Sequence, residues 1–293
     1  MYPDFYCIGG QKCGTDWIYR NLALASSQIW LPPMKEIHYF DEKFVPEQIQ
    51  QQLRDTPPPQ TLQVRYRLWS REMRVIGSVI KRTPRFGTLG WLSHYYLLPR
   101  SDEWYAGLFS PAPGQLCGDI TPDYSILDPT AVAHVHRLNP AAKVFFIVRD
   151  PVERAWSAIK MAMRHRRRVP ELRDAPLDVV HEFLARPSFL YRSNYPKTIE
   201  HWESVFGSAQ FRVWLFDDLI RQPEQLLREI CQFLGVAQDG VLPKSISEKA
   251  NSDPTQQTMP EAVKTVLLEH FRTDLEILGA RFGSAIASWS AMG

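Results

Sequence analysis

The stretch FYCIGGQKCGT, residues 5–15, joins a short apolar run to a glycine-rich turn. The apolar run is rich in aromatic and β-branched residues, which predicts a buried strand. Ile18, Leu22 and Ala25 then repeat with a helical period, so a helix is expected directly after the turn. Backbone N–H groups and the positive end of the helix dipole meet at such a turn, which therefore favours phosphate or sulfate.

Two more apolar runs, Lys143 to Val148 and Phe211 to Phe216, are each followed by a helical pattern. Strands that alternate with helices predict an α/β protein with a central, mostly parallel sheet and helices on both faces. We therefore expect a P-loop-like three-layer α/β/α fold.

Two polar stretches interrupt this pattern. The stretch near 45–64 is rich in Gln and Pro, and the other spans 244–260; both compositions favour surface loops. A terminal helix follows, with one apolar stripe made of Val263, Leu267, Phe271, Leu275 and Leu278. We expect a single domain over residues 1–293 with loop insertions at these two places.

The charge balance excludes a strongly basic nucleic-acid binder, because 34 Lys and Arg oppose 32 Asp and Glu. The four cysteines are scattered singly, without the paired spacing of zinc sites or disulfide frameworks, so reduced thiols are expected. The N-terminus lacks a charged region followed by a long apolar stretch, and the chain has no stretch long and apolar enough to span a membrane. We expect a cytoplasmic protein that binds neither membrane nor nucleic acid.

In the first motif, Lys12 brings a point charge to the glycine-rich turn, and Thr15 offers a hydroxyl at the start of the helix. The Walker A pattern ends in Gly-Lys-Ser/Thr, whereas here Lys12 precedes Gly14 and the pair after that glycine is Thr15-Asp16. The turn is therefore not an ordinary ATPase loop. The alternative is a plain strand-to-helix turn with a solvated lysine.

The second motif is Lys35 to Phe40, with the sequence KEIHYF. If this segment is extended, Glu36, His38 and Phe40 share one face of it. A carboxylate and an imidazole on one face can take a proton from a hydroxyl, with the carboxylate as base and the histidine orienting it. The alternative is that both are ordinary surface residues.

The third motif begins at Arg149, which ends the second apolar run. Asp150 is expected to cap the next helix, with Pro151 in the first helical position and Glu153 completing a capping box. Arg149 then lies at the carboxyl edge of the sheet, where open α/β sheets bind ligands, and with Ser157 it can grip a phosphate. The alternative is that Arg149 pairs with a nearby carboxylate and Ser157 is an ordinary helix residue.

In residue type, order and spacing, the three motifs together resemble the sulfotransferases that depend on PAPS (3'-phosphoadenosine 5'-phosphosulfate). The similarity is closest to the heparan-sulfate N- and 3-O-sulfotransferase branch with its bacterial relatives, and it extends to Gly118–Tyr124 and Tyr195–Trp202. The resemblance implies transfer of a sulfuryl group from PAPS to a hydroxyl or amine, with PAP as the product.

The resemblance also implies residue roles. Lys12 would bind the bridging oxygen and the sulfuryl group, Glu36 would be the general base, and His38 would assist it. Arg149 and Ser157 would hold the 3'-phosphate. No metal would be needed. The other implied donor-binding residues are Gly10, Gln11, Cys13, Gly14, Thr15, Asp16 and Trp17, together with a lid lysine that is either Lys244 or Lys249.

The chain departs from the family in two places. Asp119 and Ile120 stand where the family commonly has Gly-Glu-Lys-Ser/Thr-Pro, so a lysine near the acceptor is missing, and Asp16 replaces a residue that is often Thr. The basic and aromatic stretch from Arg65 to Arg85 suits a sugar or anionic acceptor. The resemblance favours a saccharide, and a small-molecule metabolite is the alternative.

Two other functions compete with sulfuryl transfer. The run from Val213 to Asp217 has the form of a strand that ends in a magnesium-binding aspartate, as in a P-loop kinase-like phosphoryl transferase. The missing lysine at Ile120 fits a non-catalytic module that binds a nucleotide or a polyanion.

Overall fold

The computed structural model describes residues 1–44, 46–47, 49–51, 86–166, 168–239, 246 and 257–290. The strands are β1 (Phe5–Cys7), β2 (Ile29–Trp30), β3 (Leu116–Ile120), β4 (Lys143–Val148) and β5 (Phe211–Leu215). The α-helices before β4 are α1 (Thr15–Ala25), α2 (Phe40–Lys43), α5 (Phe86–Leu97), α6 (Asp102–Gly107) and α7 (Pro129–Leu138). Those after it are α8 (Pro151–Arg166), α9 (Val169–Asp174), α10 (Pro176–Leu184), α11 (Pro187–Tyr191), α12 (Tyr195–Gln210), α13 (Phe216–Arg221), α14 (Pro223–Leu234), α15 (Glu261–His270) and α16 (Arg272–Phe282). Two 3-10 helices are η1 (Pro122–Ile126) and η3 (Gly283–Ser290).

Within these residues the strands form one parallel sheet in the order β2-β3-β1-β4-β5. The three apolar runs, of which the first is Phe5 to Ile8, form the strands β1, β4 and β5. In the structure β1 and β5 each end one residue earlier than the run. Central β1 pairs with β3 on one side and with β4 on the other. The carboxyl ends of β1, β3 and β4 therefore meet at one edge of the sheet.

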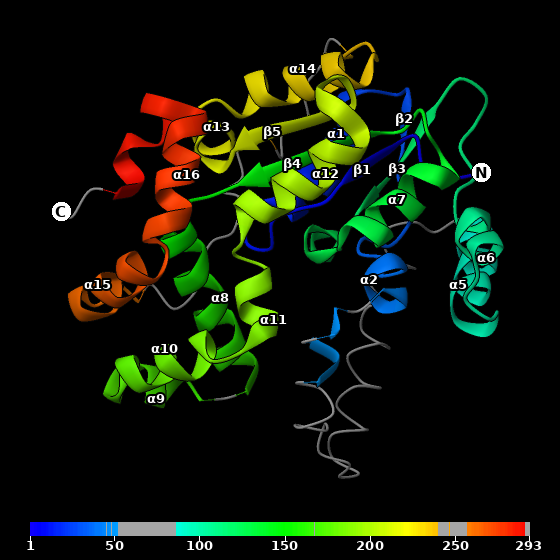
Figure 1. Ribbon diagram of the computed structural model, residues 1–293. Helices are drawn as coiled ribbons and strands as arrows, with labels where there is room; N and C mark the ends of the chain where they lie inside the picture. Colours follow the sequence, from blue (N-terminus) through cyan, green and yellow to red (C-terminus); the bar gives the residue numbers. More distant parts are fainter. Residues whose placement is uncertain are drawn as a thin grey trace.

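Helices cover both faces of the sheet, as Figure 1 shows. Consecutive residues of β4 point to opposite faces: the Phe146 ring contacts Tyr195 of α12, whereas Phe145 contacts Trp214 of β5. Trp214 in turn contacts Phe233 of α14. Since α12 and α14 lie on opposite faces, the predicted three-layer α/β/α arrangement is confirmed.

The terminal helix differs from its prediction. The structure has two helices, α15 and α16, which meet at Phe271, and all five residues of the predicted stripe are buried. The stretches 45–64 and 244–260 lie mostly outside the described residues, so the single domain with two insertions stays a prediction. The buried apolar residues that the structure describes form one continuous cluster.

The four cysteines are buried and form no disulfide. Among the described helices, none combines the length and the apolar character that a membrane span requires.

The packing of β1 against β3 gives a stability prediction. Gly118 of β3 pairs with Phe5, and a Cβ atom on Gly118 would lie 2.1 Å from the Phe5 ring. Gly118→Ala should therefore lower the free energy of unfolding by about 1–3 kcal/mol, as overpacking does. Gly279→Ala is the matched control, because no atom lies within 4 Å of its added Cβ. Urea unfolding that gives both variants the same midpoint would contradict this packing.

Candidate active site

The glycine-rich turn is fastened to the neighbouring strand. The Gly10 N–H donates to the Ile147 carbonyl oxygen at 2.7 Å, and the Ile147 N–H donates to the Gly9 carbonyl oxygen at 3.1 Å. Gly14 has a φ of 83°, and a Cβ atom there would lie 2.8 Å from Leu219, so glycine is required. The first amides of α1 have no acceptor inside the helix. They are left to face an anion.

Lys12 and Arg149 lie together although they are 137 residues apart. The Lys12 carbonyl oxygen accepts from Arg149 Nη1 at 3.5 Å. Lys12 Nζ lies 3.8 Å from Met161 Sδ on α8. Met161 is one helical turn beyond Ser157 on the same side of α8. The Lys12 ammonium group thus lies beside α8, the helix that carries Ser157 and that Arg149 closely precedes.

Arg149 stands between α8 and α13. Its guanidinium lies 4.9 Å from the centre of the Phe216 ring, and Nη2 is 3.3 Å from Glu153 Oε2. Asp150 caps α8 as predicted, since its Oδ1 accepts from the Val152 N–H at 2.8 Å. Glu153 pairs with Arg149 instead of completing the capping box. Beside Arg149 is a hollow of about 280 Å³ whose lining includes Glu153, Phe216, Arg221, Ser288 and Trp289.

The second motif is not extended, although an extended segment was the condition for placing Glu36, His38 and Phe40 on one face. Glu36 has a φ of 64° and His38 a φ of 55°, both in the left-handed region. Two hydrogen bonds hold this conformation: the Glu36 N–H donates to the Ile120 carbonyl oxygen at 3.2 Å, and the Ile37 N–H donates to Thr121 Oγ1 at 3.0 Å. The side chains of Glu36 and His38 still lie close together, 3.8 Å apart. Phe40 is fully buried and begins α2.

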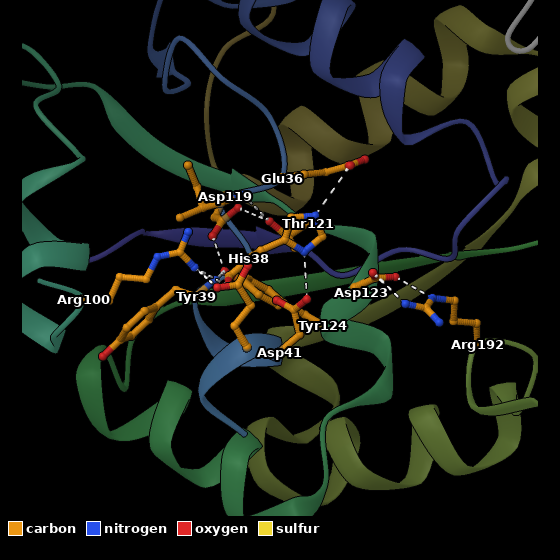
Figure 2. A network of polar contacts seen from close by, with 12 residues as sticks. Glu36, His38, Tyr39, Asp41, Arg100, Asp119, Thr121, Asp123, Tyr124 and Arg192 are labelled. Atoms are coloured by element: carbon orange, nitrogen blue, oxygen red, sulfur yellow. Dashed lines mark hydrogen bonds and ion pairs between the residues drawn. The ribbon is translucent and has the colours of Figure 1, made fainter. Parts of the chain in front are cut away.

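A buried carboxylate fixes this turn, as Figure 2 shows. Asp119 accepts hydrogen bonds from Tyr105 Oη at 2.7 Å, Tyr124 Oη at 2.8 Å and Thr121 Oγ1 at 2.7 Å. Burial raises the pKa of Asp119 to about 6, against the lowering effect of these three donors. Because Thr121 also accepts from the Ile37 N–H, Asp119 orients the segment that carries Glu36 and His38. Ile120, at the position of the missing lysine, is buried and contributes its backbone oxygen.

His38 lies between two carboxylates (Figure 2). Its Nδ1 is 2.7 Å from Asp41 Oδ2, and its Nε2 is 3.8 Å from Glu36 Oε2. Burial lowers the pKa of His38, but the hydrogen bonds to Asp41 and Glu36 outweigh it and raise the pKa to about 10. For Glu36 the two effects have the opposite signs. Burial raises the pKa of this carboxyl group, but the contacts with His38 and Lys35 outweigh burial and lower the pKa to about 2. At neutral pH the site therefore holds an imidazolium and a carboxylate.

Sequence reasoning did not assign roles to Lys35 and Asp41. Lys35 Nζ lies 2.8 Å from Glu36 Oε1 and 3.2 Å from Thr15 Oγ1, so this ammonium group joins the second motif to the start of α1. Both residues flank the predicted pair in the sequence. Charged residues adjacent to a candidate base were a signal that could have been followed.

The junction between α11 and α12 also contacts the site. Arg192 holds Asp123 with two hydrogen bonds of 2.8 and 2.9 Å, and Tyr195 Oη lies 3.5 Å from Cys13 Sγ in the turn. Among the described residues, possible metal-ligand atoms of His38, Asp41 and Asp123 lie within 4.8 Å of one another. Asp41 is paired with His38 and Asp123 with Arg192, so internal pairs account for this group.

A second hollow, of about 300 Å³, is lined by residues from η1, from the start of α7, and from α11 and α12. Its polar lining includes Glu47, Ser125, Asn194, Lys197 and His201, and Tyr191 adds an aromatic ring. The hollow beside Arg149 is thus lined by a predicted site residue, whereas the lining of the second hollow includes neither Glu36 nor His38.

Other predicted residues are placed as follows. Trp17 is buried, with a relative exposure of 1%, and is the third residue of α1. Asp16 is exposed and pairs with Arg20 at 3.0 Å. Asp217, the carboxylate of the kinase-like alternative, accepts from Trp289 Nε1 at 3.1 Å. Lys244, Lys249 and the basic stretch 65–85 lie outside the described residues.

Comparisons with known proteins bear on the family and the fold of the chain. A model of the sulfotransferase family matches residues 3–240 of the chain. A search of curated protein sequences found no match to this chain.

Solved structures are similar over nearly the whole chain. A sulfotransferase from Alicyclobacillus acidocaldarius has a TM-score of 0.66 and 24% identity, over 99% of this chain and 100% of that one. The sulfotransferase domain from the curacin biosynthetic pathway has a TM-score of 0.51 and 14% identity, over 93% and 98%. At these identities the solved structures show a shared fold.

The charges around His38 predict a pH dependence of stability. The pKa of His38 rises from 6.5 to about 10 on folding, so its contribution is complete below pH 6.5 and is lost as the pH rises toward 10. The pKa of Glu36 falls from 4.5 to about 2, so its contribution is complete above pH 4.5 and is lost as the pH falls toward 2. Urea unfolding should show that the stability difference between wild type and His38→Gln narrows as the pH rises from about 6 to about 10.

Asp41→Asn is the control for this experiment. It removes the strongest hydrogen-bond partner of His38, so the pKa of His38 should fall. The difference in unfolding free energy between Asp41→Asn and the Asp41→Asn, His38→Gln double variant should therefore narrow at a lower pH. A difference that stays constant across the whole range would show that folding does not raise the pKa of His38.

Proposed function

Because this chain belongs to the sulfotransferase family, we propose that it transfers a sulfuryl group from PAPS to a hydroxyl or amine and releases PAP. The observation that carries the proposal is the meeting of Lys12, Arg149 and Glu36 around one edge of the sheet. Lys12 contacts Arg149, and Glu36 is joined to Thr15 of the same turn through Lys35. An anion-binding turn, a phosphate grip and a carboxylate thus share one site.

We place the two ends of the donor on two groups of residues. The 5'-phosphosulfate lies on the backbone amides from Gly10 to Trp17, next to the ammonium groups of Lys12 and Lys35. The 3'-phosphate lies on Arg149 and Ser157. The adenosine occupies the hollow beside Arg149, where Phe216 offers a ring. Lys244 or Lys249 completes the donor site in this proposal.

In the reaction, the acceptor oxygen or nitrogen forms a bond to sulfur in line with the bond to the bridging oxygen, which breaks. The electron pair of that bond leaves with the phosphate of PAP, where Lys12 neutralises the new charge. Glu36 accepts the acceptor proton, and the His38 imidazolium, held by Asp41, orients the carboxylate. These steps need no metal.

The low pKa of Glu36 in the free protein fits this role only if it rises when the donor binds. Lys35 is one of the groups that lower it, and the same ammonium group lies 3.2 Å from Thr15 in the turn. A bound phosphosulfate attracts Lys35 away from Glu36 and so makes the carboxylate a stronger base. Lys35 also supplies a positive charge where Ile120 replaces the family lysine.

The acceptor enters from the side of His38. The hollow lined by η1, α11 and α12 combines hydroxyl, amide, cationic and aromatic side chains, a lining that suits a hydroxylated ring. We propose a saccharide, as in the heparan-sulfate branch of the family, or a small-molecule metabolite as the acceptor.

Ligand-induced stabilisation tests the donor. PAP at about one hundred times its Kd should raise the free energy of unfolding by about 2.7 kcal/mol, whereas Mg-ATP at the same concentration should not. Arg149→Met should weaken binding of PAP but leave binding of adenosine 5'-phosphate unchanged, because only PAP carries the 3'-phosphate. Stabilisation by Mg-ATP and not by PAP would favour the kinase-like alternative.

Substitution of the base tests the chemistry. Glu36→Gln keeps the shape of the side chain but cannot take a proton, so kcat should fall by about 10²–10⁴ while the Kd for PAP stays within about twofold. Lys12→Ala is the companion variant and should lower kcat by about 10²–10³. Turnover is measured with labelled PAPS, an acceptor panel and mass spectrometry of the product. A Glu36→Gln variant with wild-type kcat would remove Glu36 from the mechanism, and PAPS binding without transfer to any acceptor would favour the non-catalytic alternative.

A further inference from the structure

Arg154 is a fully buried cation on α8, behind the glycine-rich turn. None of its side chain is exposed. Its Nη2 donates to Ser193 Oγ, and its guanidinium lies 5.0 Å from the centre of the Phe189 ring. Nε and Nη1 are both buried and have no hydrogen-bond partner in the part of the chain that the structure describes.

No carboxylate of the described residues forms an ion pair with Arg154. The charged side chains that act on it are Arg149 and Arg192, which are also cations, and burial lowers the pKa of its guanidinium. Arg192 is different, because Asp123 holds it with two hydrogen bonds. An unpaired charge in the interior destabilises a protein. Its presence next to an anion-binding turn indicates a function.

A chain of contacts connects Arg154 to the turn. Ser193 Oγ accepts a hydrogen bond from Arg154. The Ser193 carbonyl oxygen accepts a second one from the Tyr195 N–H at 2.9 Å. Tyr195 Oη lies 3.5 Å from Cys13 Sγ, and a Cβ atom on Gly10 would lie 3.3 Å from Tyr195 Cε1. Arg154 therefore supports the back of the turn while its own atoms stay out of reach of a ligand.

We propose that Arg154 is a positioning residue for the donor, whose charge stays unpaired in the free protein and is compensated by the phosphate groups of PAPS. This inference rests on the proposed function. The free protein is strained by the buried charge, and the bound donor relieves that strain. Part of the binding selectivity for a polyanion thus comes from a residue that does not touch it.

Arg154→Met tests this role, because methionine fills similar space without charge. Without ligand, the variant should unfold at the same temperature as the wild type or a higher one. With ligand, the Kd for PAP should rise on the order of tenfold or more, whereas the Kd for uncharged adenosine should not change. Calorimetry with both ligands gives the ratio of the two affinities. Arg154→Lys, which keeps the charge, should largely restore that ratio.

Arg281→Met is the matched control, since Arg281 already pairs with Glu203 on the surface; it should leave the ratio unchanged. Arg154→Gln gives the same comparison if the methionine variant does not fold. A wild-type ratio of the two affinities in Arg154→Met, or in Arg154→Gln where that variant replaces it, would overturn the inference and leave the donor assignment intact. A wild type that binds adenosine and PAP equally would contradict the proposed donor itself.

Discussion

The site depends on the two hydrogen bonds that fasten the glycine-rich turn to β4, between Gly10 and Ile147 and between Ile147 and Gly9. They continue the parallel pairing of β1 with β4 past the end of β1. Arg149 lies two residues after Ile147. The pairing therefore brings the Arg149 guanidinium to the Lys12 carbonyl oxygen. A turn held only by its own residues would leave the two cations free to separate.

Charge pairing then divides the site into two parts. On the acceptor side, Lys35, Glu36, His38 and Asp41 form a row of alternating charge, and Arg192 is paired with Asp123. Such pairs keep the base ionised and oriented while the site is empty. On the donor side, Arg154 has no acidic partner among the described residues. Its positive charge adds to those of Lys12 and Arg149 on the side where two phosphate groups are proposed to bind.

Much of the fold could be predicted from the sequence, because short apolar runs and helix caps are local signals, whereas the donor-binding roles of Lys12, Arg149 and Ser157 stay predictions. The family model confirms the sulfotransferase resemblance. The strand β3 was missed because Gly118 and Asp119 interrupt its apolar pattern. The left-handed conformations of Glu36 and His38 depend on hydrogen bonds to Ile120 and Thr121. Such contacts, like those of Arg154 and Arg192, exist only after folding, so no local pattern indicates them.

A crystal structure of the protein with PAP bound is the most direct test of the shared site. The 5'-phosphate should accept hydrogen bonds from the amides of the turn between Gly10 and Trp17, and the 3'-phosphate should lie within hydrogen-bond distance of Arg149 and Ser157. A nucleotide that occupies another surface, or that leaves Arg149 without a phosphate contact, would contradict the proposed arrangement.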